Sequence, residues 1–184
     1  NVVSEPQLTK EERYNLAKEC IAKEDYENAV LHYEQAARLD CAIAEYELAL
    51  LYLNGTGIEV DEKKASYYFE LAAMLEHTES QYQIAECFRI GRGVPRNYRK
   101  AVYWYRQAAN KSHKGAIAAI ANCYYRGEGV VQDYEQAVKY LTLAVEDNHA
   151  QSNYYLAECY FNGKGVEKDE TKAIEYYKAA ALAG

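Results

Sequence analysis

Glycine recurs in this chain with a fixed period of 36 residues. Eight of the ten glycines form four Gly-x-Gly triplets, at Gly55/Gly57, Gly91/Gly93, Gly127/Gly129 and Gly163/Gly165. Alanine recurs in the same register, at Ala49, Ala85, Ala121 and Ala157. A fixed period of this length is typical of a solenoid, in which each supersecondary unit stacks on its neighbours. The chain is therefore expected to fold as a repeat protein.

Each period reads as a helix, a glycine loop and a second helix. The apolar residues of the segment 79–90 follow helical spacing, and the glycines then end the helix because a residue without Cβ tolerates the left-handed conformation. A side chain suited to the N-cap position precedes the second helix of each period, at Asp61, Asn97, Asp133 and Asp169. The sequence therefore predicts an all-α fold, a right-handed α-solenoid superhelix of antiparallel helix pairs.

A shorter copy of the unit precedes the four that carry glycine triplets. The distance from Ala17 to Ala29 is 12 residues, whereas the distance from Ala49 to Ala65 is 16 residues. Four loop residues are therefore missing, although the second helix keeps its register and Asp25 stands at its N-cap position. Residues 1–9 are expected to form an extended lead-in.

Two related repeat families match these units. Residues 14–40 resemble a tetratricopeptide repeat, with signature residues at Leu16, Ala17, Tyr26, Ala29, Tyr33 and Ala36. Residues 41–184 resemble four Sel1-like repeats, whose pattern A-x-x-x-L-G-x-x-Y-x-x-G-x-G-V-x-x-D-x-x-K-A-x-x-W-Y-x-K-A-A is matched by QIAECFRIGRGVPRNYRKAVYWYRQAA and its three sister segments. The chain departs from the family at the turn between units, where Glu76, Ser112 and Asn148 stand in place of a frequent glycine. The expected organisation is a lead-in (1–9), a tetratricopeptide-like repeat (10–40) and four Sel1-like repeats (41–184) of a longer protein.

The resemblance implies a non-catalytic scaffold or adaptor that binds a peptide or a partner domain. In these families the binding surface is usually the concave face, which the first helix of each pair lines. One alternative is a C-terminal regulatory or substrate-docking region of a larger enzyme such as a protein kinase. A hydrolase is a weaker alternative, because some Sel1-like proteins have been linked to β-lactam binding.

The net charge of −7 is divided unevenly along the chain. Residues 1–86 carry −11 and residues 128–184 carry −5, whereas the segment between Glu86 and Glu128 has nine basic residues and no acidic one. A basic belt is predicted there, at Arg92, Arg96, Arg99, Lys100 and Arg106. Arginine forks onto carboxylate and phosphate, so the belt favours a short acidic or phosphorylated segment of a protein partner. The acidic flanks argue against DNA, although a solvated surface without a ligand explains the charges equally well.

The resemblance also places two columns of side chains on the concave face. The candidate partner-binding residues are Tyr14, Lys18, Tyr46, Leu53, Tyr82, Glu86, Arg89, Asn122, Tyr125, Arg126, Tyr154 and Phe161. Tyrosine and arginine are frequent at the energetic centres of interfaces. Packing between neighbouring first helices is the competing interpretation of the same columns.

No catalytic, metal or cofactor site is predicted. The histidines at 77, 113 and 149 repeat with the 36-residue period, and stacked helices hold equivalent positions about 8–10 Å apart, too far for a shared metal ion. They are expected to be turn residues between units, and the cysteines small core residues. The five cysteines form no CxxC motif, which favours reduced thiols and a cytoplasmic location. No apolar run is long enough for a membrane span.

Overall fold

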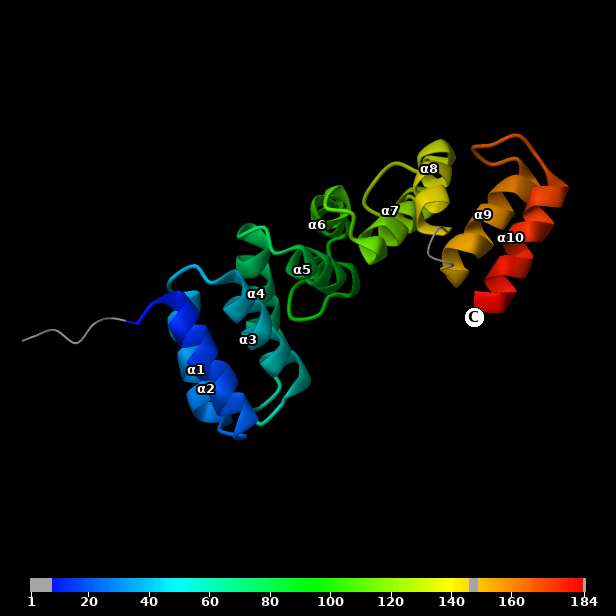
Figure 1. Cartoon of the computed structure of the whole chain (residues 1–184). Coiled ribbons are helices and arrows are strands. Elements are labelled where there is room, and N and C mark those ends of the chain that lie inside the picture. Colours follow the sequence, from blue (N-terminus) through cyan, green and yellow to red (C-terminus); the bar gives the residue numbers. More distant parts are fainter. Residues whose placement is uncertain (1–7, 146–148, 184) are drawn as a thin grey trace, which may run out of the picture. The chain divides into compact units, whose positions relative to one another are not determined.

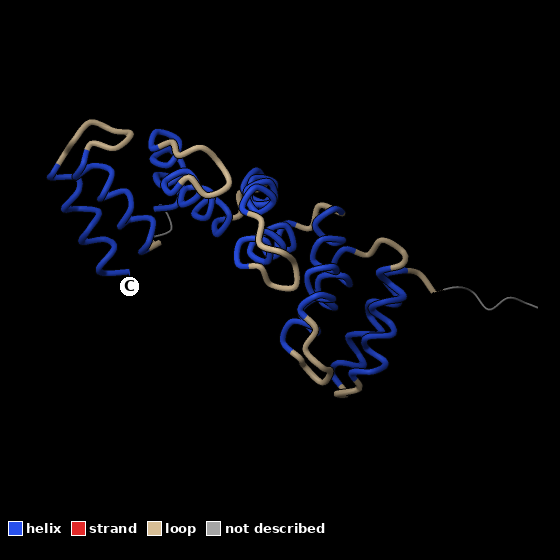
Figure 2. Tube along the Cα trace, turned by 180° about the vertical axis from the view of Figure 1, so that it is seen from behind, coloured by secondary structure: helices blue, strands red, loops and turns tan. Residues whose placement is uncertain are grey.

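The computed structural model describes residues 8–145 and 149–183, and their regular structure is helical throughout (Figure 2). In chain order the helices are α1 (Lys10–Ala22), α2 (Tyr26–Ala37), α3 (Ala42–Asn54), α4 (Glu62–Met74), α5 (Thr78–Ile90), α6 (Tyr98–Asn110), α7 (Lys114–Arg126), α8 (Tyr134–Val145), α9 (Ala150–Asn162) and α10 (Glu170–Ala183) (Figure 1). Residues 1–7 of the predicted lead-in and the turn residue Asn148 lie outside the described residues. Thr9 caps α1 in a reciprocal arrangement with Glu12.

The chain forms two compact units, residues 1–95 and 96–184. Unit 1 contains α1 to α5 and unit 2 contains α6 to α10. Consecutive helices pack against each other within each unit, as antiparallel pairs α1–α2 and α3–α4 in unit 1 and α7–α8 and α9–α10 in unit 2. Each unit therefore has the repeated helix-pair construction that the sequence predicts.

The two positions of a triplet require glycine for different structural reasons. Gly163 ends α9 in the left-handed conformation, with φ of 66°, and its N–H bonds to the Cys159 carbonyl. Gly165 also has a positive φ, 70°, but it lies directly against α8, where a Cβ would come within 2.3 Å of the Tyr134 carbonyl carbon. The first glycine thus supplies a backbone conformation, and the second also supplies the space that the loop needs to pack on the preceding repeat.

Two of the described turns between helix pairs each contain one residue in the left-handed conformation that is not a glycine. Glu76 and Ser112 have φ values of 63° and 62°, so the chain keeps the turn that the family builds with glycine. The next residue in each case, His77 or His113, then caps the following helix. The Nδ1 atoms of His77, His113 and His149 accept backbone N–H groups at 3.3, 3.1 and 3.3 Å. The periodic histidines are turn residues, as predicted, and they also act as N-caps.

Apolar residues of each unit are buried between neighbouring helices. In unit 1, Leu48 and Phe69 are fully buried. In unit 2, Leu141 and Leu156 form a core with Cys159, and half-buried tyrosines pack around it. The single tryptophan, Trp104, lies on α6 and is 8% exposed.

Candidate functional site

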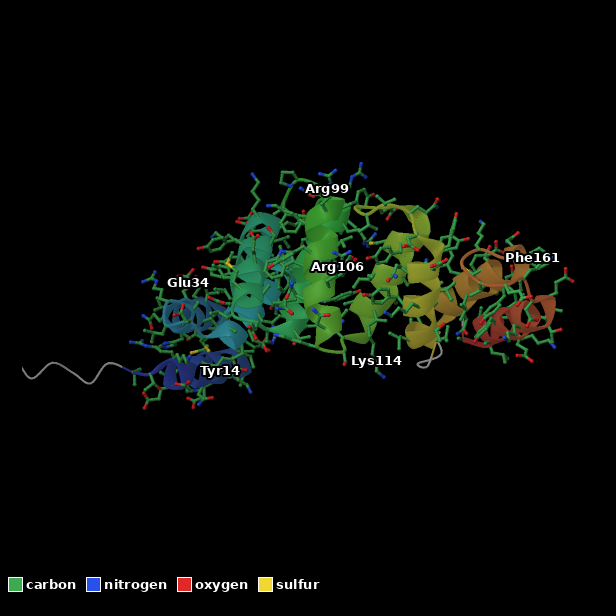
Figure 3. All side chains as sticks on the ribbon, turned by 90° about the horizontal axis from the view of Figure 1, so that it is seen from above. Tyr14, Glu34, Arg99, Arg106, Lys114 and Phe161 are labelled. Carbon is green, nitrogen blue, oxygen red and sulfur yellow. The ribbon has the colours of Figure 1, made fainter. Side chains whose placement is uncertain are left out.

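Helix α6 presents positive charge and one aromatic ring on its exposed side. Arg99, Tyr103 and Arg106 are spaced four and three residues apart, so they lie along one side of the helix. Tyr103 is 55% exposed and both arginines are exposed. Figure 3 shows Arg99 near the start of α6 and Arg106 further along the same helix. We call Arg96, Arg99, Lys100, Tyr103 and Arg106 the α6 face.

Aromatic rings hold two of these guanidinium groups in place. Arg106 donates from Nη2 to the Tyr124 hydroxyl at 2.7 Å, and its Cζ lies 5.9 Å from the centre of that ring. The Cζ atom of Arg96 lies 5.6 Å from the Tyr98 ring centre. A guanidinium on a ring keeps its charge and most of its N–H donors, so both arginines can still bind an anion.

Helix α6 begins with an N-cap but without an acidic residue in its first turn. Asn97 caps α6 by accepting the Lys100 N–H at 3.1 Å, and the first turn contains no acidic residue. Cations in the first turn oppose the helix dipole, at a cost of about 0.3–1 kcal/mol each. The remaining belt residue, Arg92, belongs to unit 1, where its Nε lies 3.7 Å from Glu62 Oε1.

Three of the predicted concave-face residues of unit 2 lie in the seam between α7 and α9. Asn122 donates from Nδ2 to Gln151 Oε1 at 3.3 Å. Arg126 donates to the Tyr155 hydroxyl, and the Tyr125 and Tyr155 ring centres are 4.7 Å apart. Packing between first helices therefore uses these side chains, as the competing interpretation expected.

Tyr154 and Phe161 are the more accessible aromatic members of the predicted columns in unit 2. They lie two turns apart on α9 and are 48% and 47% exposed. The Tyr154 ring packs on Tyr177 of α10, with ring centres 5.9 Å apart. Lys168 places its Nζ 5.7 Å from the Phe161 ring centre.

In unit 1, two of the three predicted tyrosines pack against the second helix of their own pair. The Tyr14 ring is 5.9 Å from that of Tyr33, and Lys18 Nζ lies 5.7 Å from the Tyr14 ring centre. The Tyr46 ring is 6.0 Å from that of Phe69. Burial, and then the charge of neighbouring glutamates, raises the pKa of Tyr14 and of Tyr46. Leu53 is half-buried near the end of α3.

The predicted residues Glu86 and Arg89 form an ion pair on α5. Arg89 binds Glu86 through Nε and Nη2, with Nη2 only 2.6 Å from Oε2. Tyr82, one turn earlier on the same helix, is half-buried. Burial is the main cause that raises the pKa of Tyr82, and the charge of Glu86 is the second. The structure thus joins the predicted Arg89 to a carboxylate of its own helix.

Sequence reasoning missed a column of stacked tyrosine pairs. Tyr52 stacks on Tyr68 with ring centres 6.0 Å apart and planes 2° apart. The same stack recurs in unit 2, at Tyr124 with Tyr140 and at Tyr160 with Tyr176. The signal was present, because Tyr68, Tyr140 and Tyr176 keep the 36-residue register.

Burial explains the behaviour expected of the cysteines. All five are free thiols, and all except Cys20 are buried. Burial raises the pKa of Cys87 and of Cys159 to about 11, which disfavours the reactive thiolate. Among the described residues, no group of three or more His, Cys, Asp or Glu side chains could hold a metal ion.

The repeat register identifies the family. The Sel1 repeat model matches the chain five times, at residues 14–41, 42–77, 78–113, 115–149 and 150–184. The chain belongs to the Sel1 repeat family. The model also counts the first helix pair as a Sel1 repeat, where the sequence analysis expected a tetratricopeptide repeat. Sel1 repeat proteins are generally non-catalytic scaffolds for protein interaction.

Solved Sel1 repeat structures have the same fold. A protective antigen of uropathogenic Escherichia coli with an SLR fold is 26% identical with a TM-score of 0.83, over 95% of this chain and 38% of that chain. A Sel1 repeat protein of Oxalobacter formigenes is 29% identical with a TM-score of 0.80, over 96% of this chain and 72% of that one. The predicted all-α solenoid class is therefore confirmed. The chain spans less than half of the Escherichia coli antigen.

Another solved structure shares the fold at lower sequence identity. The Helicobacter pylori cysteine rich protein B has the fold at 22% identity and a TM-score of 0.51, over 68% of this chain and 90% of that one. No curated protein sequence is significantly similar to this Sel1 repeat chain. Within the described ranges, no helix is both long and apolar enough to cross a membrane.

Proposed function

We propose that this Sel1 repeat chain is a non-catalytic adaptor that binds an acidic or phosphorylated segment of a protein partner on the α6 face. The observation that carries the proposal is the exposed side of α6, where Arg99 and Arg106 flank Tyr103. No acidic residue lies between Glu86 and Glu128 to neutralise this side from within the sequence. The five free thiols agree with a protein that works in a reducing compartment.

The chemistry of the α6 face suits carboxylate or phosphate better than a long polyanion. Guanidinium groups form paired hydrogen bonds with carboxylate and phosphate oxygens. Tyr103 adds a ring on which an apolar side chain of the segment can lie. Acidic residues dominate the sequence on both sides of the belt, so a nucleic acid that extends beyond the α6 face would meet repulsion.

Tyr154 and Phe161 of the predicted concave face are further candidate contacts for the bound segment. Both rings are about half exposed, so a bound segment can bury them further without unpacking the core. Exposed aromatic side chains are frequent anchors in protein interfaces. If they anchor a partner, the double variant Y154A/F161A should reduce recovery of that partner while α9 remains folded.

Charge reversal on α6 tests the main proposal. Fluorescence anisotropy would measure binding of a glutamate-rich peptide, with and without phosphoserine, to the full chain. We expect R99E/R106E to weaken binding of both peptides about tenfold or more, because two charge-assisted contacts become repulsive. The matched control is K139E on α8, which alters an exposed cation at the register position of Tyr103 and should change affinity by less than about twofold. Equal losses in the two variants would show that only net charge matters and would contradict a site on α6.

Stability separates a loss of binding from a loss of fold in this experiment. The single variant R99E puts a carboxylate in the first turn of α6, where the helix dipole favours it by about 0.3–1 kcal/mol. We therefore expect R99E to melt at the same temperature or higher while it binds the peptide more weakly. A variant that lost both affinity and stability would count against the interpretation.

A further inference from the structure

An open pocket of about 520 Å³ lies in unit 1, between α2, the first glycine loop and the start of α4. Tyr52 forms its aromatic wall, and the ring is fixed from behind by its stack on Tyr68. Val30, Ile58 and Val60 supply aliphatic surface. A pocket of this size is large enough for one long side chain.

The charged groups of the pocket are mainly carboxylates. Glu27, Glu59 and Asp61 line it, against a single ammonium group from Lys64. The Asp61 carboxylate is engaged, because it caps α4 by accepting the Lys63 and Lys64 N–H groups. Glu27 and Glu59 are exposed and have no hydrogen-bond or ion-pair partner within the described part of the chain. Two carboxylates are therefore available to a cationic ligand.

The Lys64 ammonium group forms a cation–π contact with the tyrosine that lines the pocket. Its Nζ lies 4.7 Å from the centre of the Tyr52 ring, well within the roughly 6 Å range of a cation–π contact. Lys64 is exposed and its side chain is long, so the ammonium group can swing out into water. The ring face is thus a cation site that a flexible residue of the chain itself occupies.

We propose that this pocket binds an arginine side chain of a partner protein. The guanidinium would replace the Lys64 ammonium on Tyr52, because a planar and weakly hydrated cation stacks on aromatic rings better than an ammonium does. The aliphatic stem of the arginine would lie on Ile58 and Val60, and the guanidinium N–H groups would face Glu27 and Glu59. This site lies in unit 1 and is independent of the α6 face, whose proposed ligand has the opposite charge.

The equivalent pocket of unit 2 provides a natural control. It repeats the stacked tyrosines at Tyr160 and Tyr176, and Lys172 Nζ lies 5.2 Å from the Tyr160 ring centre. However, Lys168 adds a second ammonium group, so its two carboxylates face two cations. Both cations are also paired, Lys168 with Glu170 at 2.8 Å and Lys172 with Asp169 at 3.7 Å. The same geometry without excess negative charge should not attract arginine.

An NMR titration of the full chain with N-acetyl-arginine methylamide tests the proposal. The neutral isostere N-acetyl-citrulline methylamide serves as the ligand control. We expect the arginine compound to shift the amide and methyl signals of Ile58 and Val60, and to leave Val166 of the unit 2 pocket unchanged. Equal shifts from the citrulline compound, equal shifts at Val166, or no shift at any concentration would each overturn the proposal.

Two variants with opposite expected signs sharpen the result. K64M removes the competing ammonium and should raise the affinity for the arginine compound about two- to fivefold. E27Q/E59Q removes the two available carboxylates and should lower the affinity about three- to tenfold at low salt. These side chains are exposed, so the rest of the spectrum should match that of the unchanged protein. Weaker binding by K64M, or unchanged binding by E27Q/E59Q, would contradict the assigned roles.

Discussion

Replacement of Gly165 by alanine should destabilise unit 2 by about 2–5 kcal/mol. Two costs add at this position. A non-glycine residue at a φ of 70° costs about 1–2 kcal/mol, and a Cβ placed 2.3 Å from the Tyr134 carbonyl forces a backbone shift that costs about 1–3 kcal/mol more. Urea unfolding followed by the fluorescence of Trp104 measures this effect, because that residue is buried in the same unit.

Gly163→Ala is the matched control for this prediction. Gly163 lies in the same loop with nearly the same φ, 66°, but the atom nearest to an added Cβ is the Lys168 Cβ at an ordinary 3.5 Å. Only the conformational cost of about 1–2 kcal/mol is therefore expected. Equal losses of stability in the two variants would show that the close approach to α8 has no energetic weight.

Glu45 is the second position at which a large effect is expected. This glutamate lies on α3 and is only 3% exposed, and its Oε2 atom has no hydrogen-bond partner within the described residues. One repeat later the equivalent residue is Gln81, which donates from Nε2 to the Ala73 carbonyl at 3.3 Å. A carboxylate cannot make such a donation, whereas a protonated carboxyl group can. Burial, and to a smaller extent the charge of Asp40, raises the pKa of Glu45 to about 7.

E45Q should therefore stabilise the chain at alkaline pH by about 2–3 kcal/mol. A carboxyl group whose pKa is higher in the folded chain favours folding in its protonated form. That contribution is complete below the unfolded pKa of 4.5, and it is lost as the pH rises through the folded value of about 7. The difference in unfolding free energy between E45Q and the unchanged chain should thus be small at pH 4 and largest at pH 8.

The variant D40N tests the electrostatic part of this account. Removal of the Asp40 charge should lower the pKa of Glu45 and restore a smaller share of the stability at pH 8, while Glu45 stays in place. A stability difference for E45Q that did not change with pH would contradict titration of Glu45. It would leave only a packing effect.

The period of the glycines was enough to predict the helix pairs and their caps. Asp61 and Asn97 cap their helices as predicted, because an N-cap depends on residues two or three positions away in the sequence. The left-handed conformation of Glu76 and Ser112 could not be predicted from their residue types, since neither residue favours that conformation by itself. The helices on either side of the turn impose it.

The surface was harder to predict than the core, because exposure depends on contacts between distant residues. Charge counting found the arginines of the α6 face, but the bond between Arg106 and Tyr124 joins residues 18 positions apart. Tyr125 and Arg126 were predicted for a groove, and both also contact Tyr155 of the next repeat. In a repeat protein, the residues best placed to contact a partner are also those that contact the neighbouring repeat.

The histidine caps fix the tautomer of each ring. An Nδ1 atom can accept a helix N–H only when the ring carries its proton on Nε2, so Nε2 is the donor nitrogen of each capping ring. His77, His113 and His149 repeat this arrangement at the start of α5, α7 and α9. One turn geometry therefore sets the same ring chemistry at three helix starts, and each capping nitrogen is engaged by the backbone.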